Sequence, residues 1–268
     1  MSSSFQFSVT AGFRVVDALQ QKIVQNAAGL LKPGYNRQKV HIGTTSGIQT
    51  DGAQDATQSR GGRAGISGGG DNLAIGATTI SFEQGMIEPA FSPTSLAIRG
   101  TGFFMVAENA SPGARVYLTR AGDFTPDAQG RLVNPQGLFL VGGGGAANID
   151  ANGRTVGVPP LVFANADGTV NLPDVSLGKV GASSMLSVSG YGDTVYQLTS
   201  TAGPLRVFAN GRAEVGFVQA SSIELMDRTG ASAILSAETN TAVQTYKIFK
   251  DMLTEFNKST DDAIQTVK

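Results

Sequence analysis

The stretch SLAIRGTGFFMV, residues 95–106, places two glycines inside an otherwise apolar, strand-like run. Gly100 and Gly102 could cradle a phosphate, as in a nucleotide-binding loop, or serve only the path of the backbone. A dinucleotide-binding fingerprint needs a third glycine three residues after the second, with a helix beginning there. Met105 occupies that position and the run continues as a strand, so we interpret both glycines as backbone features.

The residues that follow this run are β-rich and punctuated by turns. NPQG (134–137) lies between RLV and LFLV, with proline and glycine at the second and fourth turn positions. ADGT near Asp167 is a further hairpin signal, and ANGR around Asn210 is expected to join LRVF to AEVGFV. Short strands at this spacing predict an antiparallel β-rich domain with its core at about 95–205.

A helix is expected at each end of the chain. Apolar residues recur at four- and three-residue intervals over 8–31, until KPGY (32–35) ends the pattern. A similar stripe runs through 231–268, where neither Gly nor Pro occurs. This spacing is typical of a coiled-coil seam, and the alternative is a long surface helix on a globular core. The seam residues are Phe13, Val16, Ile23, Ala27 and Leu30 in the first helix and Tyr246, Phe249, Leu253 and Phe256 in the second.

The composition argues against several classes of function. The chain has 268 residues and a formal net charge of -1, which gives no electrostatic case for binding nucleic acid or an anionic membrane. The start of the sequence lacks the features of a secretory signal peptide, and no apolar run approaches the ~18 residues that span a bilayer. With no Cys and one His, zinc sites built mainly on these residues are excluded.

Residues that could support catalysis are few. His41 is expected in a solvated loop just after the first helix. Asp123, Asp127 and Asp150 could in principle supply the carboxyl pair of a glycoside hydrolase. Asp127 and Asp150, however, lie in the turn-like sequences PDAQG and DANG, where Asp serves local backbone bonding. We therefore expect that the chain is not an enzyme and that it binds neither a cofactor nor a metal ion.

Four motifs, taken in order, resemble those of the bacterial flagellar rod and hook proteins. They are AGFRVVDALQQKIVQNAAGLLKPGYNRQKV (11–40), EQGMIEPAFSPTSLAIRGTGFFMV (83–106), YLTRAGDFTPDAQGRLVNPQGLFLVG (117–142) and VQASSIEL (218–225). The residues that match the family pattern are Pro33, Gly34, Tyr35, Gly100, Gly102, Phe103, Phe104, Tyr117, Arg120, Gly122, Phe124, Asp127 and Gly130.

The resemblance implies an α+β protein whose terminal helices pack as a coiled coil, with a central antiparallel β-rich domain. The expected layout is an N-terminal assembly helix and turn (1–42), a flexible Gly-rich linker (43–72), a β-rich domain (73–217) and a C-terminal assembly helix (218–268). Only about 100 residues separate Tyr117 from Val218, which leaves room for one β-domain.

The same resemblance implies a structural subunit of the flagellar basal-body rod, most like the distal rod protein. The implied partners are copies of itself, other rod and hook proteins, the surrounding ring proteins and the flagellar export apparatus, with no nucleic acid and no membrane insertion. It would reach the basal body by type III export without a cleaved signal peptide. The alternatives are a hook or proximal rod subunit, or a secreted adhesin-like binding module.

Overall fold

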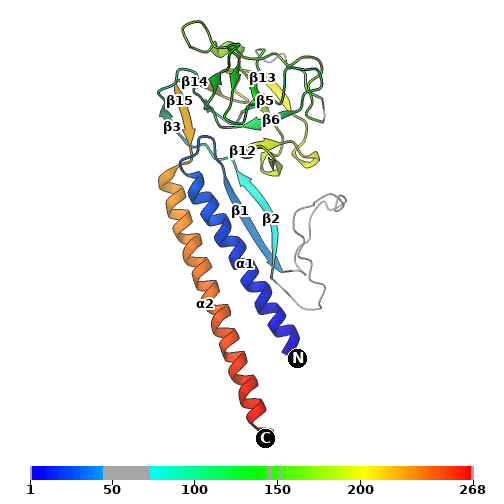
Figure 1. Ribbon diagram of the computed structural model, residues 1–268, viewed down its shortest axis with the longest axis vertical. Coiled ribbons are helices and arrows are strands. Elements are labelled where there is room, and N and C mark those ends of the chain that lie inside the picture. The colour runs from blue at the N-terminus through cyan, green and yellow to red at the C-terminus, as the bar shows by residue number, and fades with distance from the viewer. Residues whose placement is uncertain (1, 45–72, 144–146, 151, 267–268) are drawn as a thin grey trace. The chain divides into compact units, whose positions relative to one another are not determined.

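The computed structural model describes residues 2–44, 73–143, 147–150 and 152–266 (Figure 1). It divides into two compact units. Residues 28–38 and 80–231 form the first, here called the β unit, and the described residues of 1–27, 39–79 and 232–268 form the second, the helical unit. The fold is therefore mixed, with a β-rich domain and two terminal helices, as predicted. The expected linker lies almost wholly outside the described residues.

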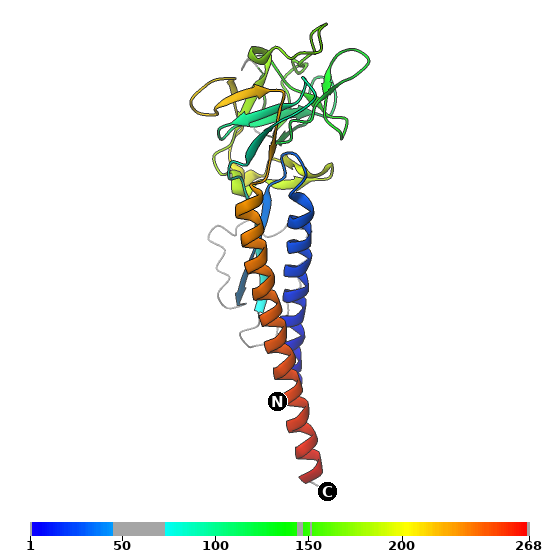
Figure 2. The ribbon, with the colours of Figure 1, turned by 90° about the vertical axis from the view of Figure 1, so that its left-hand side faces the viewer.

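The two helices are α1 (Ser2–Gly29) and α2 (Arg228–Thr266), and they lie side by side (Figures 1 and 2). Strands β1 (Arg37–Thr44) and β2 (Leu73–Ser81) pair in a two-stranded sheet that the sequence pattern did not predict. Over the described residues, neither helix is long and apolar enough to cross a bilayer.

The helix ends follow from local backbone chemistry. The amide of Lys32 donates to the carbonyl of Gly29 (3.0 Å), and Gly34 adopts a φ of 65°, so the chain turns within the predicted KPGY segment. At the start of α2 the carboxylate of Asp227 accepts a hydrogen bond from the amide of Gly230 (3.2 Å). This cap lets the helix begin at Arg228, three residues before the predicted start, with Gly230 in its first turn.

The β unit is an antiparallel assembly of short strands. Its strands are β3 (Met86–Pro89), β4 (Leu96–Arg99), β5 (Phe103–Ala107), β6 (Val116–Thr119), β7 (Thr125–Pro126), β8 (Leu132–Val133), β9 (Phe139–Leu140), β10 (Ser176–Lys179), β11 (Ser187–Ser189), β12 (Gly192–Gln197), β13 (Arg206–Ala209), β14 (Phe217–Ala220) and β15 (Ser222–Leu225). Three short 3-10 helices are η1 (Leu172–Asp174), η2 (Ser183–Met185) and η3 (Ser200–Ala202). The main sheet has the order β11-β12-β6-β5-β9-β8-β7, while β10 joins β5 to β13, and β4–β14 and β3–β15 form separate pairs.

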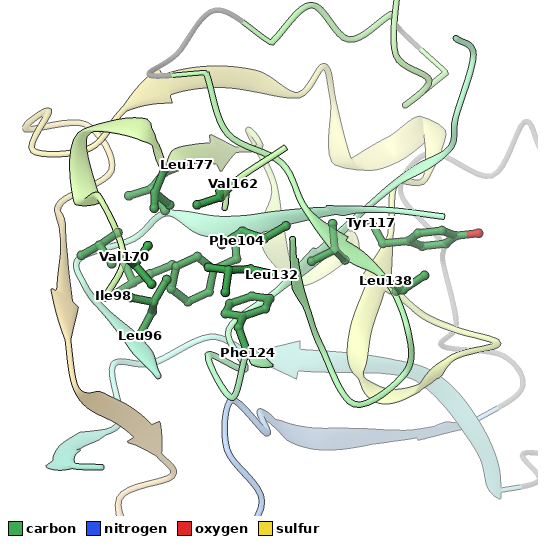
Figure 3. Close-up of a cluster of buried hydrophobic side chains, with 14 of the residues drawn as sticks. Leu96, Ile98, Phe104, Tyr117, Phe124, Leu132, Leu138, Val162, Val170 and Leu177 are labelled. Atoms are coloured by element: carbon green, nitrogen blue, oxygen red, sulfur yellow. The ribbon is translucent and has the colours of Figure 1, made fainter. Parts of the chain in front are cut away.

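Strand β5, at the end of the run 95–106, is apolar at every position. All five of its residues are buried, because each face of the strand packs against a different cluster. Phe104 and Val106 belong to one cluster, in which the Phe104 and Phe124 rings meet edge to face at 5.4 Å (Figure 3). Phe103 and Met105 belong to the other. The strand is thus the centre of the core of the β unit.

The same type of turn occurs at four places along the described part of the β unit. Each copy begins with Asp or Asn and has Gly three residues later, and in each the glycine amide donates back to the first residue's carbonyl. The glycines all have φ between 73° and 79°, a conformation that favours Gly over other residues. The copies begin at Asp127, Asn134, Asp150 and Asn165. The turns predicted at NPQG and ADGT are confirmed, and β8 and β9 pair across the first of them.

The hairpin predicted around Asn210 is wrong. The two strands that were expected to pair with each other have other partners. Strand β13, which contains the RVF of the LRVF segment, pairs with β10, and β14 pairs with β4. A tight turn does form over 212–216, where the amides of Val215 (3.1 Å) and Gly216 (2.8 Å) donate to the Arg212 carbonyl. The amide of Gly211 donates to the Gly216 carbonyl (3.0 Å) beside this turn. The Asn210 side chain then accepts a hydrogen bond from the amide of Val218 (2.7 Å), which satisfies a group that the expected partner strand would have paired.

Candidate assembly site

The two helices touch through aromatic side chains. The ring of Phe13 lies 5.4 Å from that of Tyr246 and 6.0 Å from that of Phe249, measured between centroids. Gly12 provides the space for this contact, because a Cβ atom there would lie 2.5 Å from the Phe249 ring. The predicted seam residues Phe13, Tyr246 and Phe249 are therefore brought together.

The remaining seam residues differ in burial. Val16 is fully buried and Ala27 is exposed; the partly buried ones are Ile23, Leu30, Leu253 and Phe256. Tyr246 remains 44% exposed despite its contact with Phe13. Near the start of α2, Ala231 and Leu235 are also buried but were not assigned to the seam. Leu235 lies seven residues before buried Ala242 and so continues the same spacing.

Both helices also carry large apolar side chains that the chain itself leaves exposed. Examples are Val24 on α1 and Val243, Ile248 and Met252 on α2, with exposed fractions from 41% to 67%. Apolar side chains therefore occur on more than one face of α2. A helix of this kind gains stability when a further surface covers it.

In the β unit, Gly100 and Gly102 lie against the backbone at Val215. A Cβ atom on Gly100 would lie 2.5 Å from the Val215 carbonyl oxygen, and one on Gly102 would lie 3.0 Å from the same atom. The amide of Gly102 donates to this carbonyl as well (2.9 Å). Both glycines therefore admit a close backbone neighbour.

Arg120 connects several of the motifs that were recognised in the sequence. Its guanidinium donates to the Gly100 carbonyl (2.8 Å), lies 5.1 Å from the centroid of the Phe103 ring, and approaches the carboxylate of Glu224 at 3.4 Å. The Arg120 and Glu224 side chains are 4% and 6% exposed, so this ion pair is buried. Burial lowers the pKa of Arg120 and raises the pKa of Glu224, although each partner acts against the other's shift.

Glu224 and Gln84 complete this cluster, and sequence analysis did not single out either of them. One carboxylate oxygen of Glu224 accepts hydrogen bonds from the Gln84 side chain (2.7 Å) and from the amide of Gly85 (2.9 Å). The Gln84 side chain also donates to the Ile98 carbonyl and accepts from the amide of Gly100. Their presence in the quoted EQG and SSIEL motifs was the available signal.

The turn after α1 is held against the same cluster. The amide of Gly34 donates to the backbone carbonyl of Glu224 (2.8 Å), and a Cβ on Gly34 would lie 1.9 Å from the backbone nitrogen of Ala121. The Asn36 side chain donates to the Tyr196 hydroxyl (3.1 Å). The predicted motif residues Gly34, Gly100 and Arg120 are thus close neighbours in the structure.

Of the residues considered for catalysis, His41, Asp127 and Asp150 have hydrogen-bond partners that give them structural roles. Asp123 differs, because its Oδ1 atom is buried without a hydrogen-bond partner and burial raises the pKa of its carboxyl. His41 lies on β1 instead of in a loop, is exposed, and contacts the Thr79 hydroxyl at 2.9 Å. Asp127 and Asp150 each accept two backbone amides within their own turns, as predicted. The Arg131 side chain also hydrogen bonds to Asp127 and lowers the pKa of that carboxyl. Among the described residues, no group of three or more His, Asp or Glu side chains could hold a metal ion.

Part of the β unit is similar to a domain of known proteins. Residues 97–180 match the family model of the flagellar hook protein FlgE/F/G D1 domain. The flagellar hook protein FlgE of Brucella melitensis is 39% identical over 130 residues, which cover 44% of this chain and 32% of that protein. The matched segment thus spans about a third of the hook protein's own length.

Two rod proteins of Caulobacter vibrioides match more of this chain. The flagellar basal-body rod protein FlgG is 25% identical over 226 residues, which cover 81% of this chain and 83% of that protein. The flagellar basal-body rod protein FlgF is 31% identical over 150 residues, covering 54% of this chain and 56% of that protein. These relatives are structural proteins and not enzymes. The chain is therefore similar to flagellar hook and rod proteins, and its residues 97–180 match the D1 domain that the family model describes.

Proposed function

We propose that this chain is an axial subunit of the flagellar basal-body rod, of the distal rod type, which transmits torque from the motor to the hook. The observation that carries the proposal is the similarity to FlgG over 81% of this chain and 83% of that protein. The matched hook protein has about two thirds of its length outside the similar segment. A chain with one β-rich domain between two terminal helices suits the rod protein better.

Assembly would use the helical unit. The ring contact between Phe13 and Phe249 supports a coiled coil of α1 and α2 in the assembled state. The exposed apolar side chains of α2 would be covered by neighbouring subunits. Head-to-tail contacts that do not close into a ring produce a helical filament, which suits a tubular shaft. We infer that both helices reach their full stability only when neighbours cover them.

The further partners are proposed on the same basis. They are other rod and hook proteins, the rings that surround the rod, and the export apparatus, with the rod of the basal body as the location. Export would proceed through the type III channel. The 43–72 segment would stiffen the shaft through contacts between neighbouring subunits.

A hook or proximal rod subunit is the second candidate. The observations that favour it are the 39% identity to FlgE and the 31% identity to FlgF, both higher than the 25% identity to FlgG. Purified basal bodies from a strain that lacks this chain would separate the candidates. A distal rod subunit leaves the proximal rod in place, whereas a proximal rod subunit leaves no rod to build on, and a hook subunit leaves the rod complete.

Hydrogen exchange tests the proposed assembly directly. We expect backbone amides of 8–31 and 231–268 to exchange rapidly in the purified monomer and to become protected after assembly is induced. The amides of β5 and β6 are the internal control, because these strands are buried within one chain and should be protected in both states. If both terminal segments are fully protected in a stable monomer, the filament mechanism fails.

A further inference from the structure

The chain leaves the β unit through three segments. One is the turn over 28–38, which connects to the helical unit at both of its ends; the second begins at residue 80, and the third ends at residue 231. Gly34 lies in the first segment, Gln84 and Gly85 in the second, and Glu224 in the third. Within the β unit these residues are in direct contact.

Glu224 contacts the other two segments at once. Its backbone carbonyl accepts the amide of Gly34 at 2.8 Å, and its carboxylate accepts the amide of Gly85 at 2.9 Å and the side chain of Gln84 at 2.7 Å. Strand pairing between β15 and β3 also joins the second and third segments, with Glu224 opposite Ile87. The turn segment meets Glu224 through the Gly34 hydrogen bond. It has further contacts in the Asn36–Tyr196 hydrogen bond (3.1 Å) and the Lys32–Asp193 ion pair (2.7 Å), and its last two residues begin β1, which pairs with β2.

Arg120 attaches this arrangement to the rest of the β unit. It follows directly after β6, donates to the Gly100 carbonyl at 2.8 Å, and lies 3.4 Å from the Glu224 carboxylate. Because both side chains are buried, their charges are poorly solvated and each needs the other as its counter-ion. Removal of either side chain therefore leaves an unpaired buried charge at the place where the segments meet.

We propose that Glu224, held by Arg120, is a joint that fixes the three connecting segments to one another and to the β unit, so that they move as one body. Glu224 and Arg120 act as positioning residues. Their effect on assembly or force transmission would come from the rigidity of the connections and requires no contact with a neighbouring subunit. The proposal concerns the folded chain alone and does not depend on which axial subunit it is.

Amide exchange measured by NMR on the full chain tests the joint. In Glu224→Ala we expect the Gly34 and Gly85 amides to exchange at least about tenfold faster than in the unmodified chain. The β5 and β6 core amides should stay within about twofold. Glu224→Gln keeps an acceptor oxygen for Gln84 and Gly85, so it should return the Gly85 amide to within about threefold of its original rate.

The matched control is Arg131→Met, which breaks the partly exposed Asp127–Arg131 pair in the same unit and should leave Gly34 and Gly85 unchanged. If Glu224→Ala does not fold, the double variant Arg120→Met/Glu224→Ala removes both charges and is measured in its place. The proposal is overturned if the Gly34 and Gly85 amides accelerate only in step with the β5 and β6 core, or do not accelerate at all. Either result would mean that the ion pair adds general stability or none.

Discussion

Gly122 has no room for a side chain. A Cβ atom there would lie 1.5 Å from the carbonyl oxygen of Leu96, whose own amide donates to the Gly122 carbonyl at 2.8 Å. Two backbone segments thus meet at this glycine, and neither can move without breaking the hydrogen bond. Gly34 and Gly100, two other glycines of the family motifs, likewise lie so close to a second backbone segment that a side chain would not fit.

Gly122→Ala should therefore destabilise the β unit by about 3 kcal/mol or more, because backbone cannot shift as a flexible side chain would. Urea unfolding of the full chain, followed by circular dichroism, measures the change. Gly190→Ala is the matched control, since no atom lies within 4 Å of a Cβ at that position. Equal stabilities for the two variants would show that the Leu96 segment adapts easily.

Tyr35 should make the stability of the β unit depend on pH in the alkaline range. Burial, aided by nearby Asp193, raises the pKa of Tyr35 from 10.0 to about 12. Above pH 10 the hydroxyl ionises in the unfolded chain but stays neutral in the folded one. The stability that it contributes is fully present below pH 10 and is lost as the pH rises towards about 12.

Unfolding measured at a series of pH values from 9 to about 12 tests this expectation, with Tyr35→Phe as the control. The variant cannot ionise at this position, so its stability should fall less steeply over the range. Absorbance at about 295 nm reports phenolate formation at the same time. Parallel stability curves for the two proteins would mean that Tyr35 ionises as readily in the folded chain as in the unfolded one.

The pairing of α1 with α2 depends on a small set of aromatic contacts. Phe249 touches both Gly12 and Phe13, and it is partly buried in the single chain. We expect Phe249→Ala to cost about 3–5 kcal/mol once neighbouring subunits complete its burial. This corresponds to an increase of about 100-fold or more in the critical concentration for assembly. The β unit should unfold at the same temperature as before.

Sedimentation of assembled material at increasing protein concentration measures this effect. Gln244→Ala, on the exposed surface of the same helix, provides the comparison and should change the critical concentration little. Normal assembly of Phe249→Ala would place the seam elsewhere on α2.

Helices and turns that are determined by residues close together in the sequence could be predicted from it. The helices follow from their four–three spacing, and the turns at Asn134 and Asn165 follow from a glycine at the required position. Asn210 and Gly211 are also a local turn signal, yet the tight turn forms just after them, over 212–216, and the flanking strands pair elsewhere. Val218 is buried in the cluster that contains Ile98 on β4, so long-range burial decides that pairing.

The connections across the whole chain could be predicted only in part. Gly34, Gly100 and Arg120 were identified as motif residues, but their meeting point at Glu224 was not. Glu224 lies 104 residues from Arg120 and 140 from Gln84, and no periodicity links positions so far apart. From the sequence alone, a glutamate is expected at the surface, because charged side chains are seldom buried without a partner. The partner is visible only in the folded structure.

Stability is concentrated in one part of the chain. Both clusters of buried apolar side chains lie within the β unit, between Ile80 and Val218, and include strands β5, β6 and β12. The helices of the helical unit, by contrast, keep apolar side chains such as Ile248 exposed. Opening of the terminal segments should therefore require much less free energy than opening of the β unit.

Limited proteolysis of the monomer should accordingly leave a resistant fragment that covers about residues 80–231, identified by mass spectrometry. Under assembly conditions α1 and α2 should become resistant as well, because neighbouring subunits then cover their exposed apolar faces. Phe249→Ala, under the same conditions, should keep its terminal segments sensitive and supplies the control. First cuts between β5 and β12 would contradict this division of stability, since they would place the weakest part of the chain inside its largest core.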